Sequence, residues 1–141
     1  MQRRQRLLYA FGKRIVGGGF KVPIDRILSD MLRRIDGAIA IGIIGYDGII
    51  VEHVTNDPSF NPEVAAAEAN TSLITAKKTM ENFGGGNVID ILITAERVMF
   101  YLRPLNKDYW LGVSLDPNKA NLGKLRLEVK KAVPMLQREI S

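Results

Sequence analysis

The sequence predicts an α/β domain of the α+β type, in which a five-stranded antiparallel sheet carries helices on both faces. Segments with helical spacing and short strand-like segments follow one another in the order α-β-β-α-β-β-β-α. The first strand segment, Ala38 to Ile44, is apolar on both faces, which is typical of an interior strand covered on both sides. With 141 residues, 46% of them hydrophobic, the chain is long enough for one core.

The first helix is predicted directly after Pro23, because proline suits the first turn of a helix. Its apolar stripe is Ile24, Ile27, Leu28, Met31 and Ile35. Asp36-Gly37 then supplies a residue that tolerates the left-handed conformation, so the helix should end there.

A hairpin is predicted next, since the turn signal Tyr46-Asp47-Gly48 separates Ala38 to Ile44 from a second strand, Ile49 to Val54.

The second helix is predicted from Asn61-Pro62-Glu63, which combines a capping side chain, a proline at the first helical position and an acid in the first turn. Three glycines, 84–86, should end it. Its apolar seam advances by three and four residues through Ala66, Ala69, Leu73, Ala76, Met80 and Phe83. Such small residues allow close approach to a sheet, to a copy of the same helix, or to both with different faces.

Three further strands are predicted at Val88 to Thr94, Val98 to Arg103 and Tyr109 to Leu115, joined by hairpin-length connections into a meander. Asp90 lies in the middle of an apolar run, where a charge fits an edge strand. A second chain would add at that edge.

The last helix is predicted to start near Asn118 or Asn121. Pro134 should bend it or end its regular part, because proline lacks the N–H that bonds back four residues. The buried stripe is Leu122, Leu125, Val129, Ala132, Val133, Leu136 and Ile140.

The basic character of the chain is concentrated at its start. The formal net charge is +5, yet residues 1–21 carry six basic and no acidic residues, a net charge of +6. Residues 22–141 carry 14 basic and 15 acidic residues, a net charge of −1. We therefore expect a basic arm (1–21) and a nearly neutral domain (22–141) that does not bind nucleic acid.

The arm is predicted to be partly helical, with a glycine hinge at residues 17–19. Leu7, Leu8, Phe11 and Ile15 recur at helical spacing among basic residues. Three interpretations fit residues 1–19: an extension docked on its own domain, a weak contact with an acidic partner or an anionic membrane, or a removable organellar transit peptide.

Composition also argues against an enzyme. The chain has no cysteine and one histidine, His53, so thiol chemistry, cysteine-based zinc sites and His clusters are excluded within one chain. No Walker-type, GxSxG or HExxH motif occurs, and the glycines at 84–86 follow a helix, whereas those of a phosphate loop precede one. Asp47 and Asp57 are explained as turn residues without a shared cation. We expect no cofactor and no metal.

No apolar run approaches the length of a membrane span, and no secretion signal is evident. The sequence therefore predicts a soluble, cytoplasmic protein.

The element order, the Tyr46-Asp47-Gly48 turn, the Ala-rich second helix and the opening of the last helix from Asn118 to Leu125 resemble the roadblock-type domain of dynein light chains. This domain also occurs in prokaryotic regulators of Ras-like GTPases. The resemblance covers about residues 24 to 140. It implies helix two on one face of the sheet and helices one and three on the other, as in profilin- and longin-like modules.

The resemblance also implies a homodimer in which the second helix and third strand meet their symmetry mates. The expected dimer contacts are Ala66, Ala69, Leu73, Ala76, Met80, Val88, Asp90 and Leu92. The residues expected to contact a partner are Asn70, Lys77, Lys78 and Glu81.

The leading hypothesis is a non-enzymatic homodimer that binds a small Ras-like GTPase and has no nucleotide site of its own. It would act as activator or scaffold by positioning, since Arg97 and Arg103 are more simply explained as strand-end charges than as arginine fingers. The alternatives are a light-chain-like adaptor in a motor or membrane-associated assembly, attached through the basic arm, and a sensor with an apolar pocket for a small ligand.

Overall fold

The computed structural model describes residues 23–140, and the elements follow in the predicted order. The predicted arm of residues 1–21 and its glycine hinge lie outside the described residues. The elements are α2 (Ile24–Arg34), β1 (Ala38–Gly45), β2 (Ile50–Thr55), α3 (Pro62–Phe83), β3 (Ile91–Thr94), β4 (Met99–Pro104), β5 (Tyr109–Leu115) and α4 (Leu122–Ile140).

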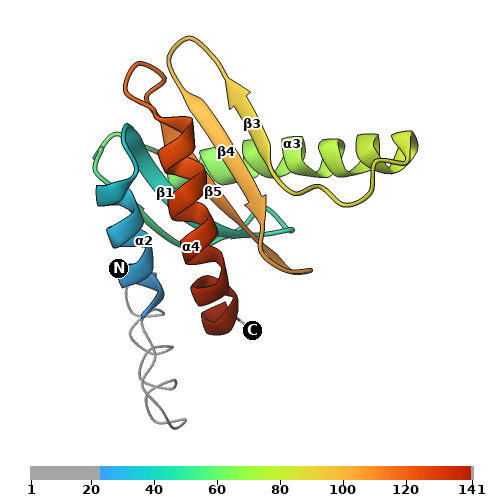
Figure 1. The fold of residues 1–141 in the computed structure, drawn as a ribbon, viewed down its shortest axis with the longest axis horizontal. Coiled ribbons are helices and arrows are strands. Elements are labelled where there is room, and N and C mark those ends of the chain that lie inside the picture. The colour runs from blue at the N-terminus through green and yellow to red at the C-terminus, as the bar shows by residue number, and fades with distance from the viewer. Residues whose placement is uncertain (1–22, 141) are drawn as a thin grey trace, which may run out of the picture.

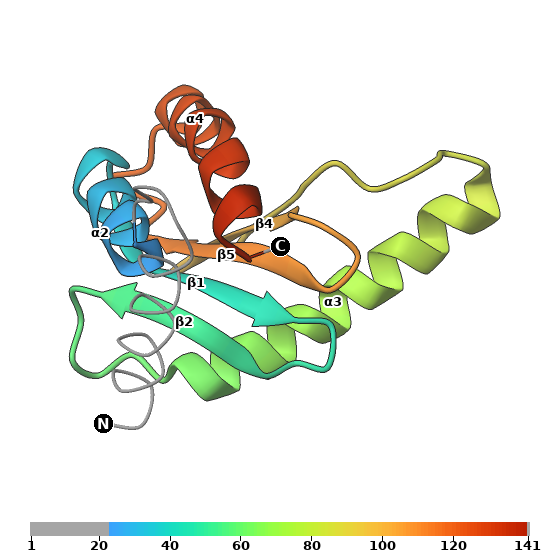
Figure 2. The ribbon, with the colours of Figure 1, turned by 90° about the horizontal axis from the view of Figure 1, so that it is seen from below.

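The five strands form one antiparallel sheet in the order β2-β1-β5-β4-β3. β1 is interior, as its two apolar faces predict, while β2 and β3 are the edges. Helices α2 and α4 lie side by side on one face and α3 crosses the other (Figures 1 and 2). The predicted three-layer arrangement is confirmed.

Each face of the sheet has its own apolar core. On the side of α2 and α4, Leu28, Leu125 and Leu136 are fully buried against the sheet. On the side of α3, the smaller core gathers around Leu73, Leu102 and Trp110. The alternation of side chains along each strand supplies both cores from the same five strands.

Gly37 lies in the turn between α2 and β1 and packs against the loop between β5 and α4. It has a positive φ of 80°, and its carbonyl accepts a hydrogen bond from the N–H of Asp116 at 2.8 Å. A Cβ at this position would lie 3.0 Å from both the nitrogen of Ala120 and the carbonyl oxygen of Asp116. The site therefore requires glycine for two reasons, the backbone conformation and the close approach.

Helix α4 begins after Asn121, whose Oδ1 accepts a hydrogen bond from the N–H of Lys124 at 3.0 Å. Of the two predicted starts, the second is thus the observed one. Pro134 does not end the helix, which continues to Ile140. Because Pro134 is exposed, the carbonyl that loses its partner lies on the solvent side of the helix.

Candidate functional site

The N-terminal half of α3 is anchored on the sheet. Asn61 caps the helix as predicted, its side chain accepting a hydrogen bond from the N–H of Val64 at 3.2 Å. Ala66, Ala69 and Leu73 point into the core of the same chain, and Leu73 has no exposed surface. These three predicted dimer contacts therefore have almost no surface to offer a second chain.

Asn70 also has a role within the chain. Its Nδ2 donates to the carbonyl of Tyr46 at 3.0 Å, and its Oδ1 accepts from Nε1 of Trp110 at 3.0 Å. Only 7% of the residue is exposed. The sequence predicted Asn70 as a partner contact, whereas the structure uses both ends of its amide to join α3 to the β1–β2 turn and to β5.

The C-terminal half of α3 runs out beyond the sheet (Figure 2). Ile74 is 50% exposed and Phe83 is 79% exposed. Gly84 ends the helix in the left-handed conformation, and the N–H of Gly85 donates to the carbonyl of Met80 at 2.8 Å. The apolar seam predicted from the sequence is therefore buried in the core at its N-terminal end and exposed at its C-terminal end, because the sheet does not extend under the whole helix.

The two flanks of this projecting helix differ in character. One flank, on the side of Phe100 of β4, carries small and apolar residues. It is located by Ala65, which borders a cavity together with Phe100, and its other members follow from helical spacing. The members of this small-residue flank are Ala65, Ser72, Ala76 and Phe83.

The opposite flank, the charged flank, consists of Lys77, Lys78 and Glu81, all exposed. Nζ of Lys77 lies 4.3 Å from the centre of the Tyr46 ring, a cation–π contact that holds the lysine beside the β1–β2 turn. Lys77 and Glu81 border a groove of about 750 Å³ between α3, the segment after it and the β4–β5 turn. Three of the four predicted partner residues therefore lie together at the surface.

Strand β3 is an edge strand, as predicted, but it is shorter than predicted. It spans Ile91–Thr94, so Val88 and Asp90 precede it. Ile91 pairs with Leu102, and continuing that register would place Ile89 opposite Pro104, which has no N–H to donate. The ladder therefore stops, and Ile89 is left 67% exposed in the segment between α3 and β3.

Asp90 is held by its own chain. Its Oδ2 accepts a hydrogen bond from the Tyr101 hydroxyl at 2.8 Å and lies 3.6 Å from Nε of Arg126 on α4. Burial, followed by the hydrogen bond to Asp90, raises the pKa of Tyr101 to about 12. The sequence explained this carboxylate by strand position alone and missed both of these partners.

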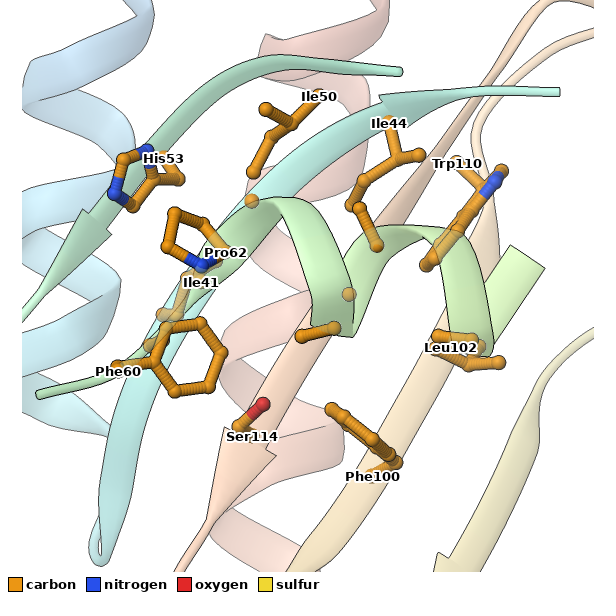
Figure 3. Close-up of a pocket in the computed structure, with 16 residues that line it drawn as sticks. Ile41, Ile44, Ile50, His53, Phe60, Pro62, Phe100, Leu102, Trp110 and Ser114 are labelled. Carbon is orange, nitrogen blue, oxygen red and sulfur yellow. The ribbon is translucent and has the colours of Figure 1, made fainter. Parts of the chain in front are cut away.

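A further cavity lies between α3 and the sheet (Figure 3), bordered by His53, Phe60, Phe100 and Ser114 among mostly apolar side chains. Its volume of about 30 Å³ is roughly that of one water molecule. This space is too small for an organic ligand, so the structure gives the small-ligand hypothesis no support here.

Asp47 and Asp57 are both used in local turns. Oδ1 of Asp47 accepts from the N–H of Ile49 at 3.0 Å. The hydroxyl of Ser59 donates to Oδ1 of Asp57 at 2.7 Å and, with the N–H of Ser59, lowers the pKa of that carboxyl. Within residues 23–140, no group of three or more His, Cys, Asp or Glu side chains is placed to hold a metal ion.

Comparison with known structures identifies the fold. MglB in a tetrameric arrangement superposes with a TM-score of 0.74 at 21% identity, covering 82% of this chain and 85% of the other. The roadblock/LC7 domain from Streptomyces avermitilis superposes with a TM-score of 0.74 at 17% identity, covering 82% and 95%. The fold is that of the roadblock/LC7 domain.

The gliding protein MglB from Thermus thermophilus also resembles this chain, with a TM-score of 0.73 at 21% identity over 82% of this chain and 86% of the other. Comparison with family models and with curated protein sequences finds no match. Among the helices of residues 23–140, none combines the length and apolarity needed to cross a membrane.

Proposed function

We propose that this roadblock-fold chain is a homodimeric regulatory module that binds a small Ras-like GTPase and has no nucleotide site of its own. The observation that carries the proposal is the projecting half of α3, which presents a small-residue flank and a charged flank beside an open sheet edge. The likeness to MglB, a gliding protein in one of the solved structures, supports a regulatory role.

The dimer would form through the small-residue flank and the β3 edge. Small side chains let a second copy of α3 approach closely, and β3 has a partner strand on one side only. Ile93 lies opposite Phe100 in the sheet, on the side of this flank, and is 41% exposed. Of the contacts predicted from the sequence, those that keep accessible surface are Ala76, Met80, Val88, Asp90 and Leu92.

The GTPase would bind on the charged flank and the groove beside it. Lys77 and Glu81 supply charges of both signs at the groove, and Lys78 lies next to them. Arg97 lies in the β3–β4 turn and does not border this groove. Positioning of the GTPase's own catalytic residues therefore suits this surface better than an arginine finger.

The dimer is tested with an Ala76→Arg variant. A bulky cation on the small-residue flank should prevent close approach of two helices without disturbing the core, so light scattering should report a monomer with unchanged circular dichroism. Thr75→Arg introduces the same side chain one position away, on the exposed side, and should remain dimeric. A wild-type monomer at micromolar concentration, or a dimeric Ala76→Arg variant, would argue against the proposed interface.

The partner is tested by purifying the chain from its source cells and asking whether the protein that accompanies it carries a phosphate-binding loop. A Lys77→Glu/Glu81→Lys variant preserves net charge and should lose that protein in gel filtration. Single-turnover GTP hydrolysis by the purified pair then separates activation from scaffolding. If the charge-swapped variant still binds the co-purifying protein, that protein binds outside the charged flank. If no GTPase co-purifies with the chain, the proposed function is wrong.

A further inference from the structure

Helices α2 and α4 carry a net charge opposite in sign to that of the rest of the described chain. Helices α2 and α4 together contain eight Lys and Arg and four Asp and Glu, a net charge of +4. The rest of residues 23–140 contains six basic and eleven acidic residues, a net charge of −5. The net charge of the whole domain is therefore near zero although its two net-basic helices lie side by side on one face of the sheet (Figure 1).

Helix α4 keeps its acidic side chains away from solvent. Glu128 and Glu139 are both 5% exposed, whereas the basic residues of this helix are exposed. Oε2 of Glu128 lies 2.9 Å from Nζ of Lys131, and its Oε1 lies 3.8 Å from a guanidinium nitrogen of Arg34. The exposed basic residues of α4 are Lys124, Arg126, Lys130, Lys131 and Arg138. The outer surface of α4 is thus cationic, with its two carboxylates beneath that surface.

Apolar side chains stand among these cations. Leu127 is 52% exposed, and Leu122, which the sequence wrongly predicted to be buried, is 38% exposed in the first turn of the same helix. Arg26 and Arg33 are exposed on neighbouring α2, where Arg33 forms an ion pair with Asp30. A helical surface that combines basic residues with exposed leucines is typical of helices that lie in the headgroup region of a bilayer.

The 22 residues before the described chain are linked in sequence to the start of α2. They carry a net charge of +6, and the described chain starts at Pro23, at the beginning of α2. Residues 1–22 thus add six positive charges to the chain directly before α2, and α2 and α4 themselves carry a net charge of +4. Anionic lipid attracts such polybasic segments, each Lys or Arg near the surface adding about fivefold to the affinity.

We infer that the surface formed by α2 and α4, here called the basic face, docks on an anionic lipid bilayer. An extended bilayer matches charges that are spread over two whole helices, and its headgroup region accepts Leu122 and Leu127. Because α3 lies on the opposite face of the sheet, a docked molecule would keep α3 and its flanks directed away from the lipid (Figure 2). The inference does not depend on the proposed GTPase partner.

The experiment is co-sedimentation of the full chain with phosphatidylcholine vesicles that contain no phosphatidylserine, about 15% or about 30%. This series varies the negative surface charge of the vesicles. The test variant is Lys124→Glu/Lys130→Glu, because these lysines are exposed and make no ion pair with residues 23–140. Binding should rise with phosphatidylserine, fall with salt, and drop about 25-fold or more in this variant.

The matched control is Lys77→Glu/Lys78→Glu, which makes the same charge change on α3 and should leave vesicle binding unchanged. Circular dichroism checks folding, and Lys124→Gln/Lys130→Gln, which only neutralises charge, replaces the test variant if charge reversal unfolds it. Equal loss in test and control, no loss in the test variant, or equal binding to neutral vesicles would overturn the inference. Binding to an acidic polypeptide but not to vesicles would assign the basic face to a protein instead.

Discussion

Replacing Asn70 with alanine removes the amide that joins α3 to the sheet. The side chain donates to the carbonyl of Tyr46 and accepts from Nε1 of Trp110, both at 3.0 Å. Trp110 is completely buried, so after the substitution its N–H has neither this acceptor nor access to water. An unpaired buried donor costs about 1–3 kcal/mol.

The carbonyl of Tyr46 loses less, because Tyr46 is half-buried and water can replace the amide there. That loss is about 0.5–1.5 kcal/mol. The two contributions together lower the free energy of unfolding by about 1.5–4.5 kcal/mol, a large part of the stability of a domain of this size.

Urea denaturation at one fixed protein concentration, followed by far-ultraviolet circular dichroism, measures this loss. Thr71→Ala, at the neighbouring exposed position, is the control and should change the free energy of unfolding by less than about 0.5 kcal/mol. In a Trp110→Phe background the indole N–H is absent, so Asn70→Ala should cost only about 0.5–1.5 kcal/mol. Equal losses in both backgrounds would show that the bond to Trp110 contributes nothing, which would refute the reasoning.

Single contacts of Gly37, Tyr101 and Lys131 can each be tested by substitution. Gly37→Ala should cost more than Gly84→Ala in urea denaturation, because both glycines have positive φ but only a Cβ at position 37 meets backbone atoms; equal costs would rule out the close contact. Since the pKa of Tyr101 is raised from 10.0 to about 12, its contribution to stability is complete below pH 10 and is lost between pH 10 and about 12. Ultraviolet titration of the folded protein should therefore show a late-titrating component that the Tyr101→Phe substitution removes. Lys131→Ala should lower the free energy of unfolding by about 1 kcal/mol, since it weakens the pairing of buried Glu128, whereas an equal loss in Lys130→Ala would argue against that pairing.

The fold was predictable from the sequence because its signals are local. The capping sequence at Asn61 and the positive-φ glycines at 37, 48 and 84 mark where helices and strands begin or end. The apolar run of β1 indicated an interior strand without any knowledge of its neighbours. Each of these signals arises from backbone geometry within a few residues, so no tertiary contact is needed to read it.

The candidate site was predictable only in part. A seam of small residues says that one side of α3 packs closely, but the length of sheet beneath the helix decides where packing ends and surface begins. Leu73 lies over the sheet and is buried, while Phe83, on the continuation of the seam, is exposed. Asn70 looked like a surface amide because its two partners are 24 and 40 residues away in the sequence.

The sequence by itself determined the order of elements, the interior place of β1 and the concentration of positive charge before residue 22. Tertiary structure alone decided how the remaining charges are distributed. The net charge of −1 is a sum over the chain, and it carries no information about faces. Only when α2 and α4 pack side by side, with Glu128 and Glu139 buried and their lysines and arginines exposed, does one side of the domain become basic.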